Sequence, residues 1–171
     1  DCIPFLRPQE ISGDCDTGLV VKHAYEWVRD KADFDADLVL TIQPSSPFRS
    51  VDDIVNCVHV AVSSQADTVF TVKPLEQYPQ WAFVQNPIKG ANTWLGMPTR
   101  YLSGIIAQDL PSLYFPTGSV YVTTREFIQE GRIYGDYVEM VPIDDPVRSV
   151  DIETEQDLEY CQFLIDRGLV K

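Results

Sequence analysis

Hydrophobic residues gather in short runs along this chain, and the clearest run ends in a cluster of turn-forming residues. Residues 38–42 carry mostly branched apolar side chains, and a Pro-Ser-Ser-Pro segment follows at positions 44–47. An apolar run of this length, bounded by turn residues, predicts a strand buried on both faces, as in a parallel sheet. Because proline cannot donate to the hydrogen-bond ladder, we expect the strand to end before Pro44.

Helical spacing of apolar residues flanks this strand on both sides. Before it, the spacing predicts a helix from about residue 18, with Asp14 or Asp16 as its N-cap. After it, Ser50 is expected to cap a helix over residues 51–64. This second helix is expected to bury one apolar face, formed by Val51, Ile54, Val58 and Val62.

A second buried strand is predicted at residues 66–72, and strand, helix and strand together form a βαβ unit. Such a unit implies a parallel pair of strands with a right-handed crossover. A strand at 118–122, a short helix from Thr124, a strand at 137–143 and an amphipathic helix from about Leu158 complete the pattern. The fold class predicted is therefore α/β, with a mostly parallel sheet and flanking helices.

The stretch 74–116 interrupts this pattern. It holds most of the aromatic residues and prolines, and short alternating runs such as 81–84 predict strands outside the main sheet. With 171 residues the chain has the length of one domain, so we expect a single domain over residues 1–171. The stretch 74–116 is then a small β-rich excursion within it.

The charge of the chain changes which partners are expected. Thirteen basic against 26 acidic residues give a net charge of -13, which would repel nucleic acid polymers and anionic membranes. The apolar fraction of 44% and the charged fraction of 23% are those of an ordinary globular protein. An acidic protein can still bind a nucleotide when a divalent metal screens the phosphates, so the charge favours a metal-dependent site.

Cysteine usage and the lack of targeting signals predict a cytoplasmic protein. The four cysteines are scattered without a C-x-x-C pair or a nearby histidine at metal-ligand spacing, so we expect reduced thiols. No apolar run is long enough to span a bilayer, and no signal peptide is visible.

Polar side chains follow the first buried strand at the point where it ends. In an open α/β sheet the carboxyl ends of the strands face the ligand crevice, which favours contact between residues 43–49 and a substrate. Gln43 offers an amide, Ser45 and Ser46 offer hydroxyls, and Arg49 offers a charged fork suited to a carboxylate or phosphate. The alternative is a tight loop whose serines cap the next helix, and spacing alone leaves both interpretations open.

An acidic pair precedes the last helix. In an extended segment Asp151 and Glu153 lie on one side, and two such carboxylates favour a cation between them. Mg²⁺ is commonly held by one or two carboxylates together with waters and substrate phosphates. The alternative is that Glu153 and Glu155 stabilise a helix N-terminus, where negative charge is favourable.

Several segments of the chain resemble one enzyme family. Residues 43–49, Gln-Pro-Ser-Ser-Pro-Phe-Arg, are similar to the QPTSPLR segment of the acylneuraminate cytidylyltransferases, the CMP-sialic acid synthetases. Other segments of that family occur in the same order and span nearly the whole chain: Leu6-Arg7-Pro8 with Asp14 and Thr17, His23-Ala24, Gln108-Asp109-Leu110-Pro111, Gly118 with Tyr121, and residues 149–155.

The resemblance implies a Rossmann-like nucleotidyltransferase that transfers CMP from CTP to a nonulosonic acid, giving a CMP-sugar and pyrophosphate. It implies that the expected partners are CTP and an acidic nine-carbon sugar, and that the protein is a homodimer. The stretch 74–116 would then close the sugar pocket and build the dimer interface. Members of the family carry upstream a first strand and a basic, glycine-containing loop for the CTP phosphates, which this chain lacks.

The resemblance also assigns roles to residues. Arg7 and Thr17 are assigned to the nucleotide, and Asp151 with Glu153 to Mg²⁺, with Asp151 as the catalytic residue; the family motif reads DID where this chain has Asp-Ile-Glu. The residues assigned to the substrate are Gln43, Ser45, Ser46, Arg49, Gln108, Gly118 and Tyr121.

Three positions depart from the family pattern. Ile106 and Ala107 stand where the family usually has arginine, and Thr117 replaces an asparagine. The lost arginine removes a charge that an anionic ligand would use. Two alternatives therefore stay open: a non-catalytic sugar-binding or dimerisation module, and a related nucleotidyltransferase that acts on another acidic sugar.

Overall fold

The fold was analysed in a computed structural model of the chain. The structure describes residues 5–75, 77–79, 83–85, 94–96 and 111–170. Two units are distinguished, and each is considered by itself. The first consists of the segments before Pro74 and after Phe115, and the second is the segment Pro74–Phe115.

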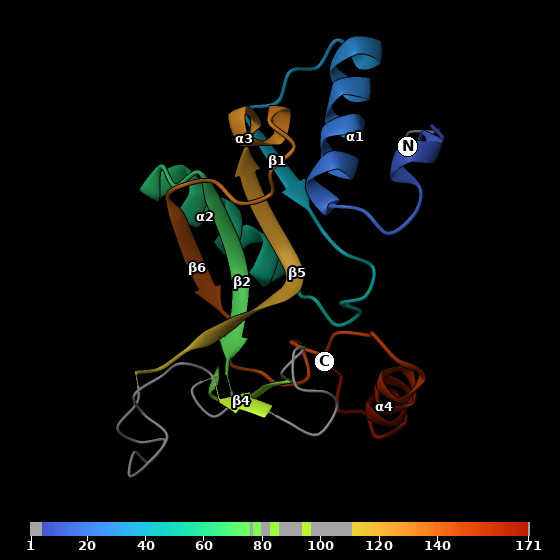
Figure 1. Cartoon of the computed structure of the whole chain (residues 1–171), viewed down its shortest axis with the longest axis vertical. Coiled ribbons are helices and arrows are strands. Elements are labelled where there is room, and N and C mark those ends of the chain that lie inside the picture. Colours follow the sequence, from blue (N-terminus) through green and yellow to red (C-terminus); the bar gives the residue numbers. More distant parts are fainter. Residues whose placement is uncertain (1–4, 76, 80–82, 86–93, 97–110, 171) are drawn as a thin grey trace. The chain divides into compact units, whose positions relative to one another are not determined.

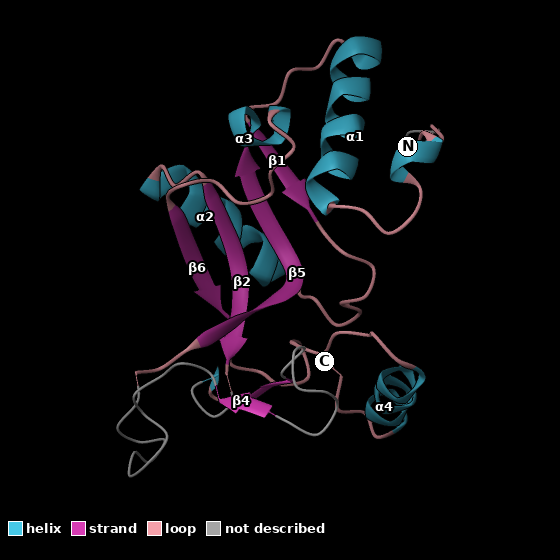
Figure 2. Cartoon of the chain, in the orientation of Figure 1, coloured by secondary structure: helices cyan, strands magenta, loops and turns pink. Residues whose placement is uncertain are grey.

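The larger unit is built from four strands and four α-helices (Figures 1 and 2). Its strands are β1 (Leu38–Thr41), β2 (Thr68–Pro74), β5 (Tyr114–Thr124) and β6 (Val138–Pro142). Its helices are α1 (Thr17–Ala32), α2 (Val51–Ser64), α3 (Arg125–Gln129) and α4 (Glu155–Asp166), preceded by the short 3-10 helix η1 (Gln9–Ile11). This architecture confirms the predicted α/β fold class.

The four strands form one mixed sheet in the order β1-β5-β2-β6. β2 and β6 are parallel, whereas β1 and β5 are antiparallel with Leu38 opposite Thr124. Figure 1 shows β1, β2 and β6 running in one direction and β5 in the other. The prediction that β1 and β2 form a directly paired parallel unit is therefore wrong in one respect. The two strands run in the same direction, but β5 lies between them. Most of β5 is buried, so the interior of the sheet suits it better than an edge.

Both faces of the sheet are covered. Val69 of β2 and Val122 of β5 pack against Cys57 and Ala61 of α2. On the opposite face lie Phe70, Val72, Tyr121 and Ile133, with Val21 of α1 packed against them. Alternating residues of β2 and β5 thus separate an apolar cluster under α2 from a face that carries an aromatic hydroxyl.

The buried face of α2 differs from the prediction. Its buried residues are Asp53, Cys57 and Ala61, four residues apart, and Ile54 packs beside them. The predicted face fails because three of its four members are exposed: Val51 at 74%, Val58 at 38% and Val62 at 68%. Small side chains at Cys57 and Ala61 let the helix approach the sheet closely, which branched valines would prevent.

The starts of the helices follow local capping signals. The Asp16 carboxylate accepts a hydrogen bond from Gly18 N at 2.7 Å, which confirms Asp16 as the N-cap of α1. Ser50 forms a capping box with Asp53 at the start of α2, as predicted. The closing helix starts at Glu155, earlier than expected, because Thr154 and Asp157 form a second capping box there.

The smaller unit contains a two-stranded antiparallel sheet of β3 (Phe83–Gln85) and β4 (Trp94–Gly96), separate from the main sheet. Its two ends are joined where Leu75 N donates to Leu113 O at 2.8 Å. Within the part of the chain that the structure describes, no helix is both long and apolar enough to cross a membrane.

Candidate functional site

The residues expected at the site follow the ends of strands. Gln43 comes two residues after β1, and Asp151 follows β6 after a short connection. Because β5 runs antiparallel to its neighbours, its first half, with Gly118, lies at this same edge of the sheet. The carboxyl edge predicted from the sequence therefore brings three separate segments together.

Gly118 is the point at which two of these side chains meet. Its φ of +74° lies in the left-handed region that favours glycine. A Cβ atom at this position would lie 2.9 Å from Gln43 Oε1 and 3.7 Å from Asp151 Oδ2. The missing side chain thus leaves room for an amide and a carboxylate to approach the same point of the backbone.

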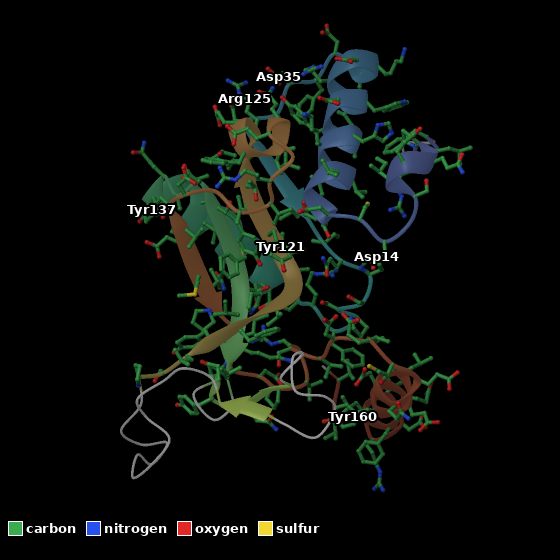
Figure 3. All side chains as sticks on the ribbon, in the orientation of Figure 1. Asp14, Asp35, Tyr121, Arg125, Tyr137 and Tyr160 are labelled. Atoms are coloured by element: carbon green, nitrogen blue, oxygen red, sulfur yellow. The ribbon has the colours of Figure 1, made fainter. Side chains whose placement is uncertain are left out.

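A cavity of about 420 Å³ opens beside this point, on the aromatic face of the sheet. Gln43, Tyr121 and Thr17, three residues singled out in the sequence, line it together with the N-cap Asp16. Its other lining residues come from the connection between α3 and β6: Gly131, Arg132, Ile133, Tyr134 and Gly135. Figure 3 shows Tyr121 on β5, in the middle of the sheet.

Two aromatic rings, Tyr121 and Tyr134, line the cavity, and Phe70 packs against both of them. The Phe70 and Tyr121 rings stack with centroids 6.1 Å apart, and Tyr134 meets Tyr121 edge-on at 5.8 Å. Tyr134 is 41% exposed, whereas Tyr121 is buried. Burial raises the pKa of Tyr121 well above its usual range, and hydrogen bonding to Tyr134 and the charge of Asp151 act in the same direction. Tyr121 therefore stays a neutral hydroxyl that can donate a hydrogen bond.

The connection between α3 and β6 was not predicted from the sequence as part of the site. It is fixed by the start of β2: the Thr68 hydroxyl donates to Ile133 O at 3.0 Å and accepts from Gly135 N at 3.0 Å. The Asp67 carboxylate accepts from Tyr137 N at 2.7 Å. The sequence did contain one indication of a tight loop here: Gly131 and Gly135 flank the segment Arg-Ile-Tyr.

The turn after β1 is hydrogen-bonded to the other segments of the site. Ser46 is buried and its hydroxyl donates to Thr117 O at 3.4 Å, while Ile152 N donates to Ser45 O at 2.9 Å. The Arg49 guanidinium donates from Nε to Ser119 O at 2.8 Å and from Nη2 to Gln43 O. These partners make residues 45–49 a hydrogen-bonded turn. The alternative that Ser45 and Ser46 cap the next helix is wrong, because the N-cap of α2 is Ser50.

Asp151 and Glu153 differ in their surroundings. Asp151 Oδ1 is buried without a hydrogen-bond partner among the described residues, whereas Glu153 is exposed. The backbone N–H of Glu153 donates to Asp157 Oδ2, which belongs to the capping box of α4. This arrangement favours the helix-terminus interpretation of Glu153. No group of three His, Cys, Asp or Glu side chains that could hold a metal ion occurs among the residues described.

Thr117, which stands in place of the family asparagine, is directed into the sheet. It is buried, and its Oγ1 lies 2.6 Å from Thr71 Oγ1 and accepts from Ser119 N at 3.2 Å. The Thr117 hydroxyl therefore does not take over a ligand contact that the asparagine amide would make from this position.

Arg7 and Gln108 are the remaining predicted residues. Arg7 is exposed and is not among the residues that line the cavity. Gln108 lies outside the described residues, as do Ile106 and Ala107.

Comparisons with known proteins agree with the sequence motifs. No family model matches the chain. The post-translational flagellin modification protein B of Campylobacter coli is 24% identical over 132 residues, which are 75% of this chain and 53% of that protein. The CMP-N,N'-diacetyllegionaminic acid synthase of Legionella pneumophila is 23% identical over 167 residues, which are 96% of this chain and 69% of that protein.

A solved structure has the same fold. The structure of CMP:2-keto-3-deoxy-manno-octonic acid synthetase complexed with CTP matches with a TM-score of 0.55 and 13% identity, over 91% of this chain and 70% of that one. The chain thus spans about half to two thirds of the length of these proteins. Together the matches support the resemblance to the cytidylyltransferases.

Proposed function

We propose that the protein containing this chain is a cytidylyltransferase that transfers CMP from CTP to an acidic sugar of the nonulosonic type, giving a CMP-sugar and pyrophosphate. The observation that carries the proposal is that Gln43 and Asp151 both approach Gly118, while Gln43 also lines a cavity together with Tyr121. The matches to two synthetases of CMP-sugars support the same reaction class.

The chemistry of the lining suits a sugar. The Gln43 amide can donate to and accept from sugar hydroxyls, and the neutral Tyr121 hydroxyl can donate. Tyr134 adds an exposed aromatic face against which the apolar side of a sugar ring can pack. Thr17, the first residue of α1, also lines the cavity, and we assign it to the nucleotide.

The reaction requires alignment more than covalent help from the protein. The anomeric hydroxyl oxygen of the sugar attacks the α-phosphorus of CTP, a new P–O bond forms, and the bond to the bridging oxygen breaks. Pyrophosphate leaves with the bonding electron pair, and the hydroxyl proton passes to water. Positioning the two substrates and neutralising the phosphate charge supply most of the catalysis in reactions of this kind.

Asp151 is the residue that fits a divalent cation. Its buried Oδ1 has no partner among the described residues, and a buried carboxylate oxygen is costly unless it is paired. Mg²⁺ held by Asp151 would supply neutralisation of the phosphate charge when bound. We therefore assign Asp151 as the catalytic residue of this proposal. Its carboxylate would be the main protein ligand of the Mg²⁺ ion.

A pyrophosphate-release assay tests the proposal. The full-length protein would be incubated with CTP, Mg²⁺ and, in turn, sialic, legionaminic, pseudaminic and keto-deoxyoctulosonic acid. We expect pyrophosphate with at least one acid, and its loss in Asp151→Asn. The absence of pyrophosphate with all four acids would refute the reaction for these sugars.

One observation favours a second candidate, a non-catalytic module that binds an acidic sugar. Thr117 is buried against Thr71 and offers the ligand no side-chain amide. Isothermal titration separates the two: binding of an acid with no pyrophosphate would identify the module.

A further inference from the structure

The guanidinium of Arg49, in the turn after β1, donates its hydrogen bonds to backbone carbonyl groups of the protein itself. Arg49 donates to Ser119 O from Nε and to Gln43 O from Nη2. Among the described residues no ion pair involves Arg49, and burial lowers the pKa of its guanidinium. A guanidinium remains charged in proteins even so, and its planar fork can hold two carbonyl groups at fixed positions.

These two carbonyls belong to the two segments that form the site. Gln43 O is the backbone carbonyl of the residue whose Oε1 meets Gly118, and Ser119 directly follows Gly118 in β5. Gln43 O also accepts from Ser46 N at 3.4 Å. Arg49 thus fixes the backbone of Gln43 next to strand β5, which the side chain of Gln43 also approaches.

We propose that Arg49 is a positioning residue that orients the Gln43 amide toward the substrate, and that it does not bind the acidic group of the substrate itself. The inference rests on the proposed function and deepens it, because it makes Gln43 the residue of this turn that contacts the sugar substrate. It replaces the prediction that Arg49 recognises a carboxylate or phosphate.

A spectroscopic experiment tests the ligand-free part of this proposal. In the full-length protein, the Arg49 Nε–H signal in a ¹⁵N NMR spectrum should exchange slowly with solvent. Arg49→Lys should shift the Gln43 side-chain amide signal, because an ammonium cannot hold both carbonyls in the same plane. A fast-exchanging Nε–H, or an unchanged Gln43 signal, would overturn the proposal whether or not the protein is an enzyme.

Kinetics test how Arg49 acts. With the acid that gives pyrophosphate, Arg49→Lys should lower kcat/KM for the sugar by about 10²-fold, the effect of misplacing a substrate contact by about 1 Å. In a Gln43→Ala background the same substitution should cost almost nothing more, because Arg49 acts through Gln43. Arg125→Lys is the matched control, since Arg125 pairs with Asp35 and Asp37 on the surface.

The methyl ester of the same acid distinguishes positioning from direct binding. We expect Arg49→Lys to reduce kcat/KM equally for the acid and for the ester. A loss with the acid that disappears with the ester would show that Arg49 binds the carboxylate, and would overturn the proposal. If the wild-type protein releases no pyrophosphate, the proposed function fails, and the NMR experiment alone decides the role of Arg49.

Discussion

At the scale of single residues, the site depends on a glycine that lets two polar groups approach one point. Gly118→Ala would place a Cβ atom 2.9 Å from Gln43 Oε1, on a backbone with φ of +74°. The amide must then move, so we expect kcat/KM to fall by about 10²-fold. Stability should fall by about 1 kcal/mol because alanine is strained at positive φ.

Gly168 provides a matched control for this variant. Its φ is +65°, and an added Cβ would meet no atom within 4 Å. Gly168→Ala should therefore cost a similar amount of stability in urea denaturation while activity stays at the wild-type level. Equal activity of the two variants would contradict the role assigned to Gly118.

Cys57 makes stability sensitive to alkaline pH. It is fully buried against the sheet, and burial raises the pKa of its thiol from 9.0 to about 12. The folded state therefore holds the proton longer than the unfolded state does. The contribution of Cys57 to stability is complete below pH 9 and is lost as the pH rises toward 12.

Urea denaturation as a function of pH checks this prediction. Between pH 9 and 11 the free energy of unfolding should fall less steeply in Cys57→Ala than in the wild type, by on the order of 1 kcal/mol per pH unit. Alkylation offers a second readout: at pH 8, iodoacetamide should label the half-buried Cys15 before Cys57. Rapid labelling of Cys57 in the folded protein would contradict its assignment to the core.

At the scale of elements, the two capping boxes are similar in sequence but unequal in their connections. Thr154 caps α4 on the surface. Ser50 caps α2 and also accepts a hydrogen bond from Arg148 Nη1 at 3.0 Å, while Arg148 pairs with the buried Asp53 at 2.7 Å. The start of α2 thereby holds the segment that leads to Asp151.

Alanine at the two caps should reveal this difference. We expect Thr154→Ala to cost about 1 kcal/mol, the ordinary value for a lost N-cap. Ser50→Ala should cost about 2 kcal/mol, because it also removes an acceptor from a charged donor. The free energies of unfolding from urea denaturation measure both, and equal values would mean that the Arg148 hydrogen bond adds nothing to stability.

Elements could be predicted from sequence as far as their determinants are local. The cap at Ser50 was predicted, and the cap of α1 was limited to Asp14 or Asp16, because a cap acts within one turn. The buried face of α2 was not, because its valines suit either side and the sheet selects the small side chains at Cys57 and Ala61. Only tertiary contact decides such a choice.

At the scale of the whole molecule, the ends of the strands could be predicted from the sequence, but the order of the strands in the sheet could not. The edge of the sheet that carries Gln43 and Asp151 follows from where strands end, and this was predictable. Gly118 reaches the same edge because β5 runs antiparallel to β1, which the sequence did not indicate. The place of β5 between β1 and β2 depends on pairing across some 80 residues of chain, for which the sequence offers no local signal. The Tyr134 wall of the cavity was missed for the same reason.

The larger unit should fold without most of the smaller one. Among the described residues, the buried clusters under α2 and around Tyr121 contain residues of the larger unit alone, and Leu75 N donates to Leu113 O at 2.8 Å. Replacing residues 76–112 by a short glycine-serine loop should preserve cooperative thermal unfolding, with Tm within about 5 °C of the wild type because closing a shorter loop costs little entropy. Loss of the cooperative transition in circular dichroism would contradict this independence.

The hydroxyl pair of Thr71 and Thr117 constrains how this protein can have diverged. The two Oγ1 atoms lie 2.6 Å apart inside the sheet, so a larger amide at either position would lack space unless its neighbour changed as well. Among homologous sequences, the two positions should therefore vary together, with asparagine at the second accompanied by a residue other than threonine at the first.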